Sequence, residues 1–97
     1  MKNYKLEKLQ NGEIFITSEK GNSMFPLIKS GQQNKLAPAT WQEVEVGDIV
    51  YCKLGCNFYT HLVKAKNEQR GVQIGNNKGG INGWTKQVYG KVIEVLN

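Results

Sequence analysis

Short runs of β-branched and aromatic residues, separated by glycine- and asparagine-rich turns, limit most strongly what this chain can fold into. The runs expected to form strands are residues 13–17, 48–53, 58–64, 71–74 and 88–95. The second and third runs predict a hairpin across 54–57, and 75–80 predicts a turn-rich loop. Residues 5–10 fit either one helical turn or a strand paired with the first run. This spacing favours a mostly β fold, a compact and strongly bent antiparallel sheet or partial barrel.

The chain is the size of one small domain. Its 97 residues, 39% of them apolar, can bury a core, so we expect a single domain over residues 1–97. No run of about 18 apolar residues predicts a membrane-spanning helix. Residues 1–5 also lack the apolar segment of a secretory signal. We therefore expect a soluble, cytoplasmic protein without a membrane anchor.

Its cysteines and single histidine give little support for a metal site. Cys52 and Cys56 flank the expected hairpin tip and could face each other across it. A cytoplasmic chain would keep both thiols reduced. Because His61 is the only histidine, a structural zinc site would lack ligands. We expect no metal and no other cofactor.

The charge of the chain is positive but scattered. Thirteen Lys and Arg against eight acids give a net charge of +5, with no run of five basic residues. Nucleic-acid binders usually concentrate such charge or interleave it with aromatics, so we interpret it as a solvated surface that favours acidic partners. Loop tryptophans either cap a core edge or anchor a partner. An exposed cluster of Trp41, Trp84 and Tyr89 beside lysines would indicate binding.

A rigid corner at residues 21–26 could present a serine as a nucleophile. The stretch reads Gly-Asn-Ser-Met-Phe-Pro. Gly21 permits unusual backbone angles, and Pro26 fixes φ and removes one N–H. Such a corner can hold the Ser23 hydroxyl before backbone N–H groups, and Gly21 and Met24 are the candidate oxyanion and binding residues. A turn serine that bonds its own backbone is the alternative.

The order of motifs along the chain resembles the catalytic core shared by signal peptidase I and the LexA-type repressor autoproteases. That superfamily has a Gly-x-Ser-Met-x-Pro box, a Val-Gly-Asp-Ile-Val strand, a strand with the general base, a Gly-Asp-Asn-type loop and a closing Gly-Lys-Val strand. The corresponding stretches are 21–26, 46–50, 59–63, 72–77 and 88–92, so the resemblance covers about residues 20–95. It implies the LexA–signal peptidase fold and a peptide or protein substrate.

The resemblance places His61 at the position of the general base. Bacterial signal peptidases and LexA-type autoproteases use lysine there, whereas archaeal and endoplasmic-reticulum signal peptidases use histidine. It implies that Ser23 attacks a peptide carbonyl while His61 takes its proton, a role that imidazole suits at neutral pH. Lys64 is another candidate, but an unbroken strand would send it to the opposite face from His61. A strand histidine bonded to a neighbour is the non-catalytic alternative.

The aspartate that orients the histidine in these families is missing. No Asp or Glu lies between Glu68 and Glu94, which leaves Asn76 and Asn82 as candidate orienting residues. Asparagine stabilises an imidazolium less: in the chymotrypsin triad, aspartate to asparagine lowers the rate about 10⁴-fold. In the family a Gly-Asp pair follows the serine box. The corresponding pair here is Gly31-Gln32, so this aspartate is missing too. Asp48 remains, and we interpret it as structural, bonding backbone at the start of its strand.

Two functions of different classes follow from these features. The first is a small serine peptidase, a Ser-His dyad or Ser-His-Asn triad, acting on an extended peptide added along its sheet edge. The second is a catalytically degenerate member of the superfamily, from a phage or mobile element, that uses the fold to bind a protein partner or nucleic acid. Repressor autocleavage is not expected, because the 22 residues before Ser23 show neither a helix-turn-helix pattern nor an Ala-Gly cleavage pair.

Overall fold

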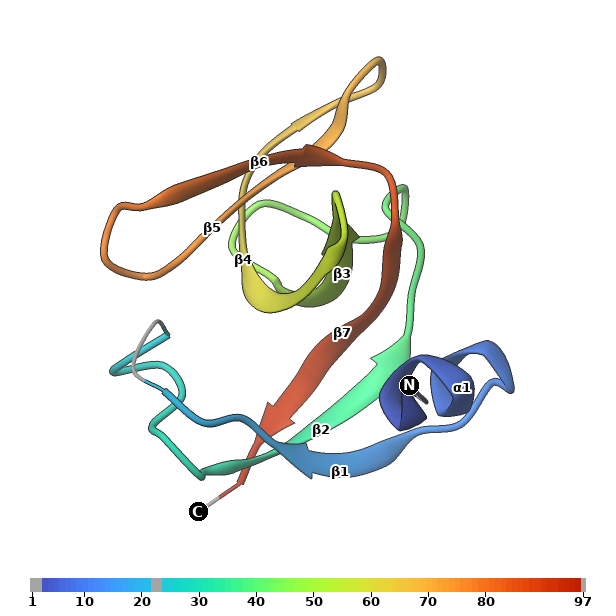
Figure 1. The fold of residues 1–97 in the computed structure, drawn as a ribbon, viewed down its shortest axis with the longest axis vertical. Coiled ribbons are helices and arrows are strands. Elements are labelled where there is room, and N and C mark those ends of the chain that lie inside the picture. Colours follow the sequence, from blue (N-terminus) through green and yellow to red (C-terminus); the bar gives the residue numbers. More distant parts are fainter. Residues whose placement is uncertain (1–2, 22–23, 97) are drawn as a thin grey trace.

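A single antiparallel sheet dominates the computed structural model, which describes residues 3–21 and 24–96. In these residues the strand order is β1-β2-β7-β3-β4-β5-β6, and the sheet is strongly bent but not closed (Figure 1). The elements are α1 (Tyr4–Gln10), β1 (Phe15–Ser18), β2 (Gln33–Pro38), β3 (Ile49–Leu54), β4 (Asn57–Asn67), β5 (Gly71–Gly75), β6 (Ile81–Thr85) and β7 (Val88–Val95). The predicted mostly β, compact antiparallel fold is confirmed at this level.

Every run expected to form a strand does so, and two strands appear that were not predicted. β2 carries the polar sequence Gln-Asn-Lys at its start, and β6 holds Asn82 and Gly83, so neither has a strand-like pattern. Residues 5–10 are helical rather than extended, because Asn3 caps α1 and its side chain accepts a hydrogen bond from Leu6 N at 3.0 Å. Nowhere in 3–21 or 24–96 is a helix long and apolar enough to cross a membrane.

The predicted hairpin between β3 and β4 is confirmed, with a two-residue turn. Leu54 pairs with Asn57 across Gly55 and Cys56, and Gly55 has φ +63°. This register places Tyr59 opposite Cys52, so the suggestion that the two cysteines face each other is wrong. Both thiols are free: Cys52 is buried and Cys56 is exposed at the tip.

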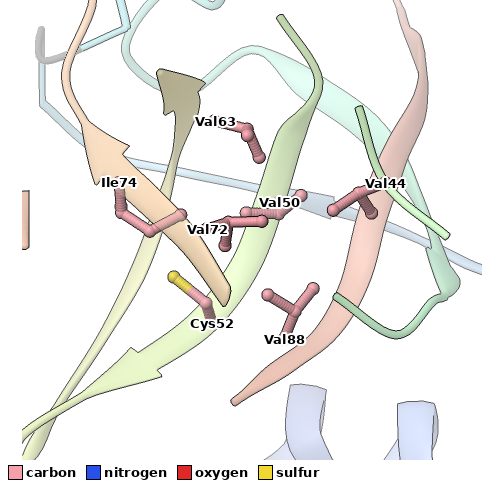
Figure 2. Packing of buried hydrophobic residues seen from close by; sticks show 7 residues of the cluster. All are labelled: Val44, Val50, Cys52, Val63, Val72, Ile74 and Val88. Atoms are coloured by element: carbon pink, nitrogen blue, oxygen red, sulfur yellow. The ribbon is translucent and has the colours of Figure 1, made fainter. Parts of the chain in front are cut away.

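The main core lies where β3, β4, β5 and β7 meet the loop before β3. Figure 2 shows its buried side chains converging, and they are Val44, Val50, Cys52, Val63, Val72, Ile74 and Val88. Branched side chains at alternate strand positions put one face of each strand into this cluster. Trp41 packs against its edge, as expected for a tryptophan that caps a core.

The opposite face of the central strands is covered in two places. α1 brings Leu9 onto Leu36 and Tyr51. Met24 of the serine box and Ile28 just after it pack against Leu62 of β4. This third cluster fixes the box segment beside the strand that carries His61.

At the β5–β6 end of the sheet, β6 contacts the end of β3. Thr85 Oγ1 donates a hydrogen bond to Lys53 O at 2.6 Å. Gly71 begins β5 with φ +92°, and a Cβ there would lie 2.3 Å from Thr85 O. A side chain at position 71 would therefore push β6 away from β5.

We expect Gly71→Ala to destabilise the fold more than Gly79→Ala. Both glycines have positive φ, +92° and +89°, but only the Gly71 Cβ would meet other atoms within 4 Å. At Gly79, the strain of an alanine at positive φ costs roughly 1 kcal/mol. At Gly71 the same strain applies, and displacing the Thr85 backbone adds about 2 kcal/mol. Urea denaturation of both variants measures the difference in the free energy of unfolding. Equal losses would contradict the close β5–β6 approach.

The two thiols should differ in reactivity. Burial raises the pKa of Cys52 to about 12, so its thiolate is scarce at neutral or mildly alkaline pH, whereas Cys56 is exposed. A disulfide exchange reagent should titrate one thiol in the native protein and two after unfolding. Cys56→Ser should abolish the native reaction, and a rapidly reacting Cys52 in that variant would refute the packing of the main core.

Candidate functional site

A cavity of about 180 Å³ lies beside the strand that carries His61. One wall is the Phe58–His61 part of β4, and the other comes from the chain around the serine box; this second wall is Glu19, Lys20, Gly21, Met24 and Ile28. Ser23, the predicted nucleophile, lies outside the described residues. Gly21 and Met24, which precede and follow it closely in sequence, share this cavity with the predicted base.

The imidazole of His61 contacts the Asn82 side chain. His61 Nδ1 lies 2.8 Å from Asn82 Oδ1. Because an amide oxygen only accepts, Nδ1 donates the proton, and in the neutral ring the lone pair is on Nε2. Tyr59 stacks on the imidazole with ring centroids 5.2 Å apart. The Asn82 hydrogen bond and the Tyr59 ring both help to orient the imidazole.

A β-bulge brings Asn82 to this position. The β5–β6 register passes from Ile74↔Gly83 to Gly75↔Ile81, which leaves Asn82 as the extra residue of β6. Bulges of this kind redirect a side chain near functional sites. Position in the sequence identified Asn82 as a candidate, but no local pattern indicated the bulge.

The two asparagines of the loop between β5 and β6 have different hydrogen-bond partners. Asn76 Oδ1 accepts hydrogen bonds from Lys78 N at 2.8 Å and Gly80 N at 2.9 Å, so this predicted orienting residue is engaged within its own loop. Asn77 Nδ2 donates to Phe25 O at 3.0 Å. That bond ties the loop to the serine box, a link that sequence analysis missed because nothing distinguishes Asn77 from Asn76 locally.

Lys64 also lies at an irregularity of the sheet. The β4–β5 register shifts between Val63 and Ala65, so the assumption of an unbroken strand is wrong at Lys64. The Lys64 stem passes over β5, since a Cβ on Gly75 would lie 3.1 Å from Lys64 Cε. Lys64 does not belong to the described residues that line the His61 cavity.

The aspartate that the sequence analysis interpreted as structural does bond backbone. Asp48 Oδ2 accepts from Glu45 N at 2.9 Å and lies 3.5 Å from Lys91 Nζ. These contacts close the turn that leads into β3. Gly21 and Met24 were the candidate residues for binding the oxyanion. The Gly21 N–H already donates to Ser30 Oγ at 3.1 Å, so the Met24 N–H is the stronger candidate donor.

A carboxylate that the sequence analysis missed stands at the cavity wall. Glu19 accepts a hydrogen bond from Thr60 Oγ1 at 2.8 Å and forms an ion pair with Lys5. Glu19 and Thr60 also line a larger groove of about 670 Å³ toward α1 and the hairpin tip. The cavity and the groove therefore adjoin along β4, and Lys5 offsets the charge of the carboxylate.

The same part of β4 has an open edge. The β4–β5 register starts at Leu62↔Gly75, so within the described chain residues 57–61 pair with β3 alone. Because Leu54 and Asn57 close the two-residue turn, the alternating pattern directs the backbone groups of Phe58 and Thr60 away from β3. An extended peptide could add to the sheet there.

No family model matches the chain, and neither a curated protein nor a solved structure shows significant similarity to it. The resemblance to the signal peptidase and LexA-type proteins therefore stays a prediction from motifs. Within residues 3–21 and 24–96, no three side chains of His, Cys, Asp or Glu are grouped to hold a metal ion.

The Asn82 contact predicts the tautomer of His61. When the His61 imidazole is neutral, Nδ1 should carry its proton. The variant Asn82→Leu should shift the ring toward the Nε2–H tautomer. Because the chain has one histidine, long-range ¹H–¹⁵N spectra report this ring alone. Asn76→Ala is the control and should leave the spectrum unchanged. A spectrum that responds to Asn76→Ala and not to Asn82→Leu would contradict the assignment.

Proposed function

We propose that this protein is a small serine peptidase with a LexA–signal peptidase-type core, in which Ser23 is the nucleophile and His61 the general base. The observation that carries the proposal is the shared cavity: Gly21 and Met24, close to Ser23 in sequence, line it together with His61. The Met24–Leu62 packing supports the same pairing, because it holds the box segment beside the histidine strand.

The reaction follows from the orientation of the imidazole. Ser23 Oγ attacks the peptide carbonyl carbon as its proton passes to His61 Nε2, since Nδ1 is bonded to Asn82. The backbone N–H of Met24 would stabilise the oxyanion. Collapse breaks the C–N bond, and the amine leaves with the proton from Nε2. Water then attacks the acyl-enzyme with His61 again as base, which releases the acid and restores the Ser23 hydroxyl.

The substrate would be an extended segment of a peptide or protein. The open edge beside Phe58 and Thr60 offers backbone partners, and the cavity next to His61 would take one side chain. We place this activity in the cytoplasm. A phage or mobile-element origin belongs to the alternative, a catalytically degenerate member that uses the fold to bind a protein partner or nucleic acid.

Turnover would be slow, because the orienting group is an amide. Asn82 fixes the ring but offers no negative charge to the imidazolium that forms during attack. A hydrogen bond to a neutral acceptor is worth about 1 kcal/mol less than one to a charged acceptor, which corresponds to a rate roughly tenfold lower than with an aspartate.

A peptide library tests the proposal. Purified protein, Ser23→Ala and His61→Ala are incubated with a diverse library at neutral and alkaline pH, and the products are identified by mass spectrometry. Products that form with the wild type and vanish in both variants are expected. Identical products from all three proteins, or none, would overturn the peptidase assignment.

Asn82→Asp should raise the activity. A carboxylate at 82 would stabilise the imidazolium through a charged rather than a neutral hydrogen bond, so we expect kcat/KM to increase about tenfold. Asn76→Asp adds the same charge nearby, but its side chain is engaged in the loop, so it should change the rate little. A larger gain from position 76 than from position 82 would contradict the proposed orienting role.

A further inference from the structure

A second surface combines cations and aromatic rings and shares no residue with the His61 cavity. Lys86 Nζ lies 5.3 Å from the centroid of the Trp41 ring. Arg70 Cζ lies 5.8 Å from the Trp84 ring. Both tryptophans are partly buried, while Lys86 and Arg70 are exposed. Each pair therefore presents an aromatic plane with a cation on it.

The two pairs belong to one patch because Gly71 joins them. A Cβ on Gly71 would lie 2.7 Å from Lys86 Cγ, so Lys86 crosses the start of β5 beside Arg70. Asn67 fixes the turn before it, since Asn67 Oδ1 accepts from Arg70 N at 3.2 Å. Arg70 and Lys86, which are 16 positions apart in the sequence, are thus brought together here by folding.

A hollow of about 380 Å³ adjoins Trp41 and extends the patch. It is lined by Trp41, Gln42, Lys66 and Glu68. Lys66 Nζ donates to Gln42 O and Val44 O, each at 2.8 Å, which holds its charge against the wall. We call Trp41, Lys66, Arg70, Trp84 and Lys86 the basic–aromatic surface.

The positive charge of this surface is not neutralised by ion pairs. The ion pairs within the described chain use Lys5, Lys35 and Lys91. Lys66, Arg70 and Lys86 take part in none of them. Glu68 lines the hollow together with Lys66, and it forms none of these ion pairs with Lys66, Arg70 or Lys86.

We propose that the basic–aromatic surface binds single-stranded nucleic acid. Phosphates would pair with Lys66, Arg70 and Lys86, while unstacked bases would lie against the indole rings and the Arg70 guanidinium. A duplex fits less well, because its bases are stacked and cannot reach a ring face. An acidic peptide would meet the cations but leave the aromatic planes without partners.

Intrinsic fluorescence tests this binding directly. The chain has two tryptophans, and both belong to the surface. Titration with oligodeoxythymidine should quench their emission, because a stacked base contacts the indole. Three neutralised phosphates predict that log K falls with log salt with a slope of about −2. No quenching, or quenching with no salt dependence, would overturn the proposal.

Charge-removal variants separate this site from general electrostatic attraction. Arg70→Ala and Lys86→Ala should each weaken binding about tenfold. Lys8→Ala is the matched control, because Lys8 Nζ also lies over a ring, 5.0 Å from the Phe15 centroid, but at the α1 end of the protein. It should change the affinity less than twofold. Equal losses from all three variants would contradict a defined site.

Competitors identify the class of ligand. Duplex DNA and poly-glutamate are added to the oligodeoxythymidine complex at equal charge. Neither competitor should displace the bound strand at concentrations at which unlabelled oligodeoxythymidine does displace it. Displacement by poly-glutamate would reassign the surface to acidic protein partners, and displacement by duplex would remove the stacking argument. Both outcomes overturn the proposal, and neither bears on Ser23 chemistry.

Discussion

The packing of Met24 and Ile28 against Leu62 is the contact on which the candidate site depends. Burying a side chain of this size contributes about 1.5–3 kcal/mol, and here it links two segments nearly forty positions apart. Leu62 follows His61 in β4. The same apolar contact that stabilises the fold therefore sets the box segment against the strand that carries the imidazole.

Irregularities in the sheet supply the remaining geometry. The β6 bulge aims Asn82 at His61, and the open part of β4 exists because β5 pairs only from Leu62 onward. Gly71 allows β6 to fold close, which also brings Lys86 beside Arg70. The close β5–β6 approach at Gly71 thus shapes the basic–aromatic surface.

The sequence predicted what short-range patterns encode and missed what depends on distant contacts. Alternating residues and turn glycines located the β3–β4 hairpin, β5 and β7, and a single histidine was an obvious candidate base. β2 and β6 were missed because partners, not local propensity, make them strands. The choice of Asn82 over Asn76 as the residue that contacts His61 and the displacement of Lys64 depend on register shifts, for which no local pattern exists. The Asn77–Phe25 bond joins two loops that are distant in the sequence.

Labelling with a fluorophosphonate tests the central claim most directly, because such reagents modify a serine that an adjacent base activates. The account predicts one adduct per chain, located at Ser23 by peptide mass spectrometry, absent from His61→Ala and from the urea-unfolded protein. The chain holds two other serines, Ser18 and Ser30, which serve as internal controls. No adduct at Ser23, or one that forms equally in His61→Ala, would contradict a Ser23–His61 catalytic pair.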